Sequence, residues 1–442
     1  MCNFEGTGLG ASRSTCSDYK GKIRFMQKDD ILRLMRDPNL IPLEKQTLLS
    51  NIADQASALN MPCYLVGGCV RDLWLRRPVN DLDVIVEGDA IQLGKSLVEV
   101  YGGKLTPHFK FNTAIWHLPA STEFVDLITA RKETYEKPGA LPTVASSKIE
   151  DDLRRRDFTI NAMALRLDGE GVGEILDPLK GQADLGRGVI RVLHPNSFMD
   201  DPTRIFRAIR YEGRYGFLMD SGTAALVNPD SLKTLHSLSG ERIRHELDLI
   251  LDEEQAAVMM LRIADLGLLP AIHPVLPEFD PNLSDYLEME THLDVPGDRR
   301  TMGYMLWFIN LGEADVLLLA NRLDFTNELT LAVWAAAQLK RGLPHLIGST
   351  PSIWTYAVEK LPLISIYAVY LVSREKALLD YISFWRHVRP HTTGNDLKTM
   401  GLPPGPRYGE ILERLRAAWL DGVLSTKSEE EELLNQLLAE PD

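Results

Sequence analysis

The most informative part of the chain runs Val66-Gly67-Gly68-Cys69-Val70-Arg71-Asp72-Leu73 and is soon followed by Asp81-Leu82-Asp83-Val84-Ile85-Val86. The apolar run at 63–66 predicts a buried strand, and the residues from 70 to 75 predict the start of a helix. The β-branched run at 84–86 predicts a second strand. A strand, a helix and a strand in close succession indicate a domain that mixes α and β structure.

Two carboxylates lie two positions apart at the start of the second predicted strand. Side chains at i and i+2 of a strand point to the same face, so Asp81 and Asp83 are predicted to project together. Neighbouring carboxylates repel each other unless a cation lies between them. Divalent metals supply that charge, and a pair of them can clamp the attacking and leaving oxygens of a phosphoryl transfer.

The glycine pair just upstream suits a phosphate ligand. Gly67 and Gly68 allow the backbone to approach a phosphate closely, and Arg71 offers a guanidinium fork for its oxygens. A glycine pair alone is usually a turn, and an Asp-x-Asp alone is usually a solvated strand end. Their close succession nevertheless favours a triphosphate and metal site.

The composition is that of a soluble globular protein. With 442 residues, 45% hydrophobic and 25% charged, the chain is expected to form about two to four domains. No signal segment opens the chain, and its apolar runs are too short or too interrupted to span a bilayer. The four cysteines lack metal-ligand spacing, so a reduced, cytoplasmic protein is expected. The net charge of -14 lowers the expectation of unspecific polynucleotide binding but allows a local basic stripe.

The hydrophobic pattern changes along the chain and predicts an α+β fold. Residues 1–25 are rich in Gly, Ser and Thr and are expected to be disordered, and residues 28–59 are helical in pattern, split by Pro38 and Pro42. After residue 170 or so, amphipathic helical stretches dominate, for example 241–251, 256–266 and 327–340, and the glutamate run 429–432 is predicted to be a solvated helix face. Between residues 61 and 167 a small mixed sheet of about five strands is expected, at 63–66, 81–87, 113–117, 124–127 and 162–166.

Three further groups of residues carry chemistry. Asp126, on the strand predicted at 124–127, is a third carboxylate that can hold or deprotonate an attacking hydroxyl. In the run Arg154-Arg155-Arg156-Asp157-Phe158-Thr159-Ile160-Asn161-Ala162, the arginines suit phosphate and ribose, and Asp157 suits a sugar hydroxyl. An ordinary basic helix end is the alternative, and it fits Arg154 in particular.

The third group is the run Asp200-Asp201-Pro202-Thr203-Arg204-Ile205-Phe206-Arg207-Ala208-Ile209-Arg210-Tyr211. Pro202 suits the first turn of a helix, with Asp200 or Asp201 near its N-cap. Asp201 and Arg204 are three residues apart and are predicted to share one helical face. An acceptor and a rigid donor so placed can read the Watson–Crick edge of a base.

These motifs, in this order, resemble those of the class II tRNA nucleotidyltransferase and bacterial poly(A) polymerase family, which carries GG-x-VRD and DxD, then RRDFTINA, then ED-x-x-R with RA-x-R. The resemblance is strong over residues 61–251 and moderate over 394–422. One departure is Asp200, which stands where the family usually has glutamate. The resemblance implies a sheet-containing nucleotidyltransferase head at 26–167, an all-helical neck at 168–250, a body at 251–345 and a tail at 346–442 that holds tRNA.

The resemblance also implies the roles of the site residues. Asp81 and Asp83 would bind Mg²⁺, with Asp126 as the third catalytic carboxylate. Asp201 and Arg204 would select CTP or ATP by hydrogen bonding. The remaining nucleotide-binding residues that it implies are Gly67, Gly68, Arg71, Arg155, Arg156, Asp157, Asn161, Arg207 and Arg210.

The identity of the added nucleotides stays open between alternatives. Within the family the product is the full CCA end, only CC, or only the terminal A. Enzymes limited to CC tend to lack a flexible loop between the first two motifs, and residues 131–142 here look like that loop, although a plain surface connection is an equal alternative. We therefore expect the full CCA end first and A alone second. A poly(A) polymerase is a further alternative, and a catalytically inactive RNA-binding protein is one of a different class.

Overall fold

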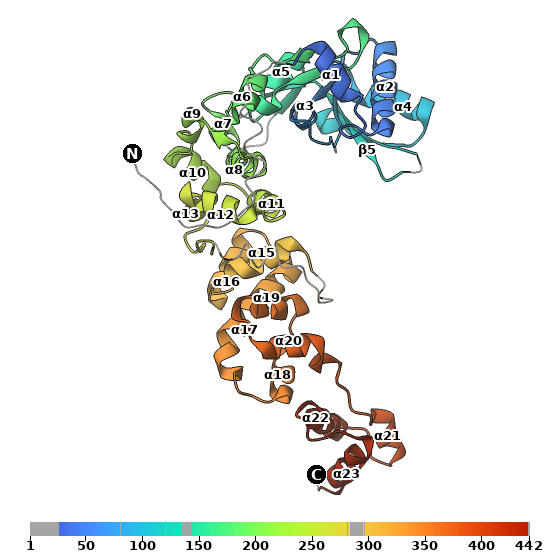
Figure 1. Ribbon diagram of the computed structural model, residues 1–442, viewed down its shortest axis with the longest axis vertical. Coiled ribbons are helices and arrows are strands. Elements are labelled where there is room, and N and C mark those ends of the chain that lie inside the picture. Colours follow the sequence, from blue (N-terminus) through green and yellow to red (C-terminus); the bar gives the residue numbers. More distant parts are fainter. Residues whose placement is uncertain are drawn as a thin grey trace. The chain divides into compact units, whose positions relative to one another are not determined.

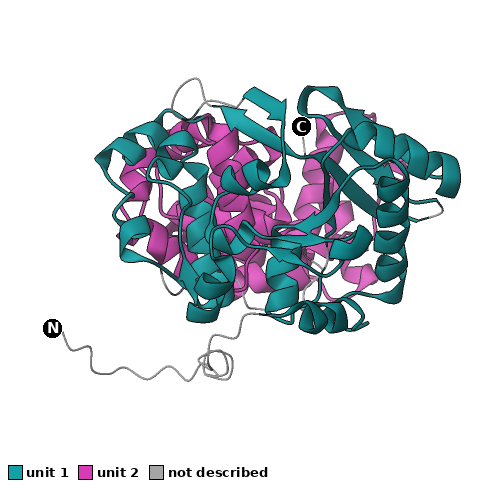
Figure 2. Ribbon diagram, turned by 90° about the horizontal axis from the view of Figure 1, so that it is seen from above, with its two compact units in different colours: residues 1–238 teal, residues 239–442 magenta. Residues whose placement is uncertain are grey.

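The computed structural model describes residues 26–79, 81–119, 121–134, 139, 143–280, 282, 295 and 297–440. The chain divides into two compact units, Met1–Leu238 and Ser239–Asp442, called unit 1 and unit 2 below (Figure 2). The finer division into head, neck, body and tail stays a prediction. The segment 1–25, for which we expected disorder, lies outside the described residues.

Seven strands form the main sheet of unit 1, in the order β3-β4-β5-β2-β1-β8-β9. Strands β2 and β5 run parallel, and the other neighbouring pairs are antiparallel. The fold class is confirmed, but the expected number of strands was too low. The missed strand β3 contains Pro107, a residue tolerated here because β3 lies at the sheet edge, and β9 has only two residues. The strands are β1 Cys63–Val66, β2 Asp83–Val86, β3 Lys104–His108, β4 Thr113–His117, β5 Phe124–Thr129, β8 Ala164–Arg166 and β9 Ile175–Leu176.

Two predicted strands begin later than expected. Strand β2 starts at Asp83, so Asp81 and Leu82 precede it. Strand β8 starts at Ala164 because residues 159–161 form a short 3-10 helix, η2 Thr159–Asn161. Strands β1 and β4 match their predicted bounds, and β5 is longer by two residues.

Helices cover both faces of the sheet. Helix α4 packs against β3, β4 and β5 and also against α2 (Figure 1). On the other face, α5 contributes Ile149 and Leu153 to a core with Tyr64 and Ile85. Pro38 and Pro42 separate α1 from α2, as predicted. The helices of unit 1 are α1 Lys28–Met35, α2 Leu43–Ala58, α3 Gly68–Trp74, α4 Ala90–Tyr101, α5 Ile149–Arg154, α6 Gly181–Arg187, α7 Ser197–Asp200, α8 Thr203–Tyr215, α9 Ser221–Ala224 and α10 Pro229–His236.

Two small sheets in unit 1 were not predicted. Strands β10 Val189–Ile190 and β11 Leu218–Met219 pair in parallel, so the region 168–250 is not all-helical. Strands β6 Arg131–Thr134 and β7 Thr143–Ser146 pair in antiparallel fashion. The predicted flexible loop at 131–142 therefore begins as a strand, and its residues 135–138 and 140–142 lie outside the described residues.

Unit 2 is helical throughout its described part. The helices expected at 241–251, 256–266 and 327–340 are found as α11, α12 and α17, and α17 runs on past Pro344. No helix in the described ranges has the length and hydrophobicity to cross a membrane. The helices are α11 Gly240–Leu251, α12 Ala256–Asp265, α13 Leu268–Ile272, α15 Arg299–Phe308, α16 Glu313–Arg322, α17 Asn327–Leu346, α18 Pro351–Val358, α19 Leu363–Ser373, α20 Lys376–Ser383, α21 Gly394–Thr399, α22 Pro406–Leu420 and α23 Lys427–Ala439.

The glutamate run in α23 is not a uniformly solvated face. Glu430 is only 1% exposed, and its carboxylate accepts hydrogen bonds from the backbone N–H groups of His391 and Thr392, from the Thr392 hydroxyl and from the Trp419 indole. The prediction of a solvated face was wrong for this residue, because α22 and the segment before α21 pack over it. Glu429, Glu431 and Glu432 are exposed as expected.

Candidate active site

Two aspartates lie side by side on one face of the main sheet in unit 1, and a third precedes the sheet nearby. Asp83 of β2 is in direct register with Asp126 of β5, and in-register residues of paired strands point to the same face. Asp81 precedes β2, and its charge acts on both Asp83 and Asp126. The sequence predicted that Asp81 and Asp83 lie together on a strand. The structure brings all three acids within electrostatic reach, although Asp81 lies outside the strand.

Burial and mutual repulsion both change the pKa values of Asp83 and Asp126. Burial raises the pKa of Asp83, nearby Arg156 opposes that rise, and the charges of Asp126 and Asp81 add to it. Burial and the charge of Asp81 likewise raise the pKa of Asp126, while His108 opposes the rise. In the described part of the chain no side-chain hydrogen bond or ion pair to these three carboxylates is found. Such a group of acids gains from a cation.

The donor set fits magnesium better than a metal held by protein alone. Among the described residues, no group of three His, Cys, Asp or Glu side chains is arranged to hold a metal by itself. Mg²⁺ is usually bound by one or two carboxylates together with substrate phosphates and water. That Asp81 and Asp83 form such a pair of oxygen ligands stays a prediction.

The glycine turn between β1 and α3 is tight, and Gly67 has a backbone conformation that favours glycine. Gly67 has a φ of 67°, and its N–H donates to the Met163 carbonyl. A Cβ at Gly67 would lie 2.5 Å from Nη1 of Arg156. Gly68 then starts α3. The turn therefore brings Arg156 close to the backbone, and contact of either glycine with a phosphate stays a prediction.

Arg71 is held inside the domain rather than presented to solvent. It is 4% exposed, and its guanidinium donates to Asn161 Oδ1 at 2.6 Å and to both oxygens of Asp72. The rings of Tyr211 and Tyr215 lie 5.2 and 4.8 Å from its Cζ atom. These three hydrogen bonds hold the Arg71 guanidinium beside the turn, and a direct phosphate contact stays a prediction.

A buried acid that the sequence analysis did not single out positions the two predicted arginines. Asp152 of α5 is fully buried and binds Arg155 Nη2 at 2.7 Å and Arg156 Nη2 at 3.2 Å. Arg155 also binds Glu133 of β6 at 2.7 Å. The signal in the sequence was the i+3 and i+4 spacing from Asp152 to the arginines, which is that of neighbours on a helix.

Asp157 lies in a complete hydrogen-bond network. Its Oδ1 accepts from the Phe158 N–H and Asn161 Nδ2, and its Oδ2 accepts from Arg207 Nε and Nη2. Burial alone would raise the pKa of Asp157, but Arg207 and these hydrogen bonds hold it below its usual value. Both oxygens have partners, so the predicted contact with a sugar hydroxyl remains a prediction.

The structure corrects the predicted shared face of Asp201 and Arg204. Asp201 is extended and lies just before Pro202, the N-cap residue of α8, and its Oδ1 accepts from the Thr203 N–H and hydroxyl, so it lies near the N-cap as predicted. Arg204 is 6% exposed and donates to Ser197 Oγ and to the Arg155 carbonyl. The helix begins after Asp201, so the two residues do not share a helical face. Arg210, from the same motif, is also buried.

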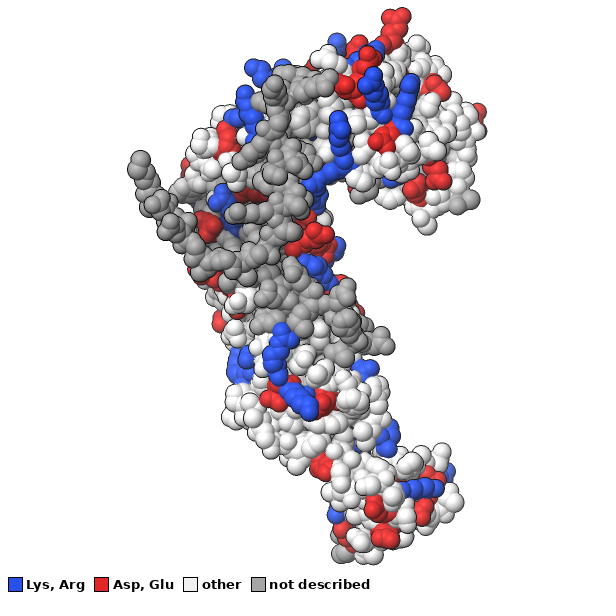
Figure 3. All heavy atoms as spheres, viewed as in Figure 1, with Lys and Arg blue, Asp and Glu red and all other residues white. Residues whose placement is uncertain are grey.

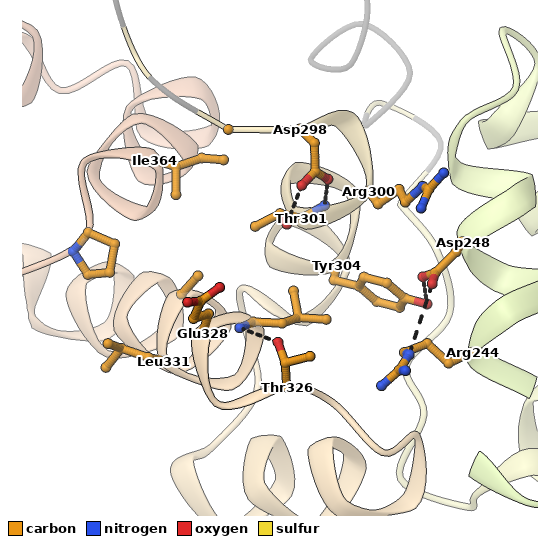
Figure 4. A pocket seen from close by; sticks show the side chains of 14 residues that line it. Arg244, Asp248, Asp298, Arg300, Thr301, Tyr304, Thr326, Glu328, Leu331 and Ile364 are labelled. Atoms are coloured by element: carbon orange, nitrogen blue, oxygen red, sulfur yellow. Dashed lines mark hydrogen bonds and ion pairs between the residues drawn. The ribbon is translucent and has the colours of Figure 1, made fainter. Parts of the chain in front are cut away.

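Unit 2 contains a separate cavity of about 540 Å³ (Figure 4). Tyr304 donates its hydroxyl to Asp248 at 2.9 Å, and Asp298 caps α15 through the Thr301 N–H. Burial raises the pKa of Asp248, although Tyr304 and nearby arginines oppose the rise. The lining mixes acids, arginines and apolar side chains, and none of the predicted site residues belongs to it.

Comparison with known proteins agrees with this arrangement. A family model described as "Poly A polymerase head domain" matches residues 63–191, and one described as "Probable RNA and SrmB- binding site of polymerase A" matches residues 216–281. The first covers every predicted site residue from Gly67 to Asn161. The motif with Asp201 and Arg204 falls between the two matches.

Two relatives and one solved structure are similar over nearly the whole chain. An A-adding tRNA nucleotidyltransferase of Halalkalibacterium halodurans is 32% identical over 88% of this chain and 94% of its own length. One of Geobacter sulfurreducens is 34% identical over 97% of this chain, which spans only 51% of that relative's length. A structure described as a CCA-adding enzyme in its apo form II is 29% identical, with a TM-score of 0.79 over 94% of this chain and 99% of that one.

Proposed function

The chain belongs to the family of tRNA nucleotidyltransferases and poly(A) polymerases, and on that premise we propose that it transfers AMP from ATP to the 3′ end of tRNA. The observation that carries the proposal is the set Asp81, Asp83 and Asp126, three acids that lack side-chain partners in the described structure and lie together beside a glycine turn. Acids arranged in this way destabilise the empty protein and suit a metal-assisted reaction.

The residues divide the work of the reaction. The 3′ oxygen of the RNA forms a bond to the α-phosphorus of ATP, and the bond from that phosphorus to the bridging oxygen breaks, which releases pyrophosphate. Asp81 and Asp83 would hold Mg²⁺, which when bound neutralises the developing phosphate charge. Asp126 would accept the proton of the attacking hydroxyl, a role that its raised pKa favours. Arg156, beside Gly67 and Asp83, would face the phosphates.

Nucleotide selection by Asp201 and Arg204 stays part of the proposal, with Arg204 acting from a buried position. Its guanidinium binds the backbone of Arg155, so it would influence base choice through the nucleotide-facing arginines as well as by direct contact. The cytoplasm is the proposed location. The buried thiols Cys63 and Cys69 are both free, which agrees with a reducing compartment.

The extent of the product is the finer part of the proposal. The sequence alone placed full CCA addition ahead of A addition, whereas the names of the two relatives above support addition of the terminal A. We therefore propose AMP addition to tRNA that already ends in CC, with full CCA synthesis as the alternative. A poly(A) polymerase is disfavoured by the net charge of -14. It is also disfavoured by the mixture of acidic and basic side chains among the described residues on the face shown in Figure 3.

The test uses three tRNA transcripts that end before, within and after the CC sequence, each incubated with Mg²⁺ and labelled ATP or CTP. The proposal expects AMP on the CC-ended transcript alone and no incorporation of CMP. Incorporation of both nucleotides on the shortest transcript would establish CCA synthesis. Long tails on an unstructured RNA would identify a poly(A) polymerase. No incorporation on any RNA would contradict the proposal and favour the inactive RNA-binding alternative.

A further inference from the structure

Strand β5, which carries Asp126, and its neighbour β4 each have one buried face and one more exposed face. In β5, Phe124, Asp126 and Ile128 are exposed or half-buried, whereas Val125, Leu127 and Thr129 are buried. In β4, Thr113, Ile115 and His117 are half-buried, whereas Ala114 and Trp116 are buried. Helix α4 packs on the buried side. Over β4 and the start of β5, the face that carries Asp126 is therefore the more exposed one, whereas α5 covers the same face farther along the strands, at Ile85 and Ile128.

One row of this face combines the aromatic rings of Phe124 and His117 with the cationic side chain of Lys104. Phe124 is 52% exposed and pairs across the strands with His117, whose ring lies 6.2 Å from it, and His117 pairs in turn with exposed Lys104. His117 is held by a 3.2 Å hydrogen bond between its Nε2 and the Thr106 hydroxyl. We call Lys104, His117 and Phe124 the outer row.

The outer row lies directly beside the reacting acids. Phe124 precedes Asp126 by two residues on the same strand face, which corresponds to about 7 Å along a strand. Next to the outer row, Thr106, Ile115, Asp126 and Asp83 form the adjoining row from β3 to β2. A base stacked on Phe124 would therefore have its neighbouring nucleotide at Asp126.

The two substrates of a nucleotidyl transfer must reach the α-phosphorus from opposite sides, because the attacking and leaving oxygens lie in line. The glycine turn and Arg156 lie on the β1 and β2 side of the acids. The outer row starts at Phe124 on β5 and extends away from β2, across β4 to β3. Aromatic rings with nearby cations are the usual means of holding a single strand, through base stacking and phosphate attraction.

We propose that the outer row is a stacking platform for the unpaired 3′ nucleotides of the acceptor RNA, with Phe124 stacking on a base and Lys104 facing a phosphate. The inference rests on the proposed function for the identity of the RNA. It assigns the specificity for a single-stranded end to the more exposed face of β4 and β5 in unit 1.

Two measurements test it, one without catalysis and one with it. Binding of a CC-ended tRNA labelled at its 5′ end is measured by fluorescence anisotropy in the absence of ATP, and AMP transfer then gives KM for tRNA and for ATP. Phe124→Ala is expected to weaken tRNA binding and raise KM for tRNA about five-fold or more, with KM for ATP unchanged. Phe124→Tyr keeps the stacking ring, so its tRNA affinity and its KM for tRNA should stay close to those of the wild type. Val100→Ala, a similarly exposed position at 56% on the α4 side, is the matched control.

Lys104→Ala is expected to reduce the slope of log affinity against log salt concentration by about 0.7, the value for one phosphate contact on a single strand. Equal binding by wild type and Phe124→Ala would overturn the inference, as would a rise confined to KM for ATP. Wild-type protein that binds tRNA in a Phe124-dependent way but transfers no nucleotide would contradict the proposed function while leaving the platform in place.

Discussion

Carboxylates in two regions of the molecule differ in the hydrogen-bond donors that the protein places around them. In the sheet of unit 1, Asp83 and Asp126 lie beside like charges, have no side-chain hydrogen bonds in the described structure, and have raised pKa values. In the last helix of unit 2, Glu430 is less exposed to solvent, yet four donors surround it and hold its pKa below the usual value against the effect of burial. Burial alone therefore does not distinguish a reactive acid from a structural one. The difference lies in whether the protein itself supplies the donors.

The largest expected effect is on catalysis. Asp81→Asn and Asp83→Asn should each lower the turnover number for AMP transfer by more than about 100-fold, which exceeds the loss typical of an outer-sphere metal partner. Asp83→Asn should at the same time raise the melting temperature, because it removes a buried charge beside two others. Radiolabelled transfer and thermal unfolding measure the two quantities. A lower melting temperature would show that the empty site is not under electrostatic strain.

The second prediction concerns stability. Glu430→Ala should lower the free energy of unfolding by about 2–3 kcal/mol, since it leaves buried N–H donors without an acceptor. Urea unfolding followed by circular dichroism measures it. Glu431→Ala is the matched control, because its ion pair with Lys427 is solvent-exposed, and it should change stability by less than about 0.5 kcal/mol. Similar losses in both variants would remove the distinction between buried and exposed acids of α23.

The third prediction makes the comparison within unit 1. Asp157→Asn should destabilise the protein by about 1–2 kcal/mol, because Asp157 is bonded to Arg207 and Asn161. Asp126→Asn, at an acid without such partners, should not destabilise it. Thermal and urea unfolding of the two variants side by side gives the result. If Asp126→Asn cost as much as Asp157→Asn, the raised pKa of Asp126 would have to be explained differently.

The smallest expected effect is a pH dependence. The folded-state pKa of Glu430 lies below its ordinary value near 4.5, so its contribution to stability is complete above that value and is lost as the pH falls through the lowered pKa. The difference in unfolding free energy between wild type and Glu430→Gln should therefore shrink by about 1 kcal/mol between about pH 6 and pH 3. A difference that does not vary with pH would mean that the neutral side chain serves equally well.

Much of the fold could be predicted, and the failures have physical causes. Strands β1 and β4 were found because their runs are short, apolar and β-branched or aromatic. Strand β3 was missed because it is an edge strand with Pro107 and a lysine, and such residues do not signal pairing. The burial of Glu430 was missed because it depends on a segment that precedes α21 and is distant in sequence.

The candidate site shows the same limits. The sequence singled out Asp81, Asp83 and Asp126, but only the register of two parallel strands places the last two side by side. It singled out Arg71 as a phosphate ligand and Arg204 as a reader of the base, but it did not show that packing holds both side chains in the interior.

The sequence by itself determined which residues are candidates for the chemistry and which family the chain belongs to, because glycine turns, paired acids and arginine runs are local features that can be read without knowledge of the fold. Only the tertiary structure decided which acids are left without donors and which part of the sheet stays exposed. Those properties depend on what packs against each side chain, and packing joins segments whose separation along the chain no local pattern records.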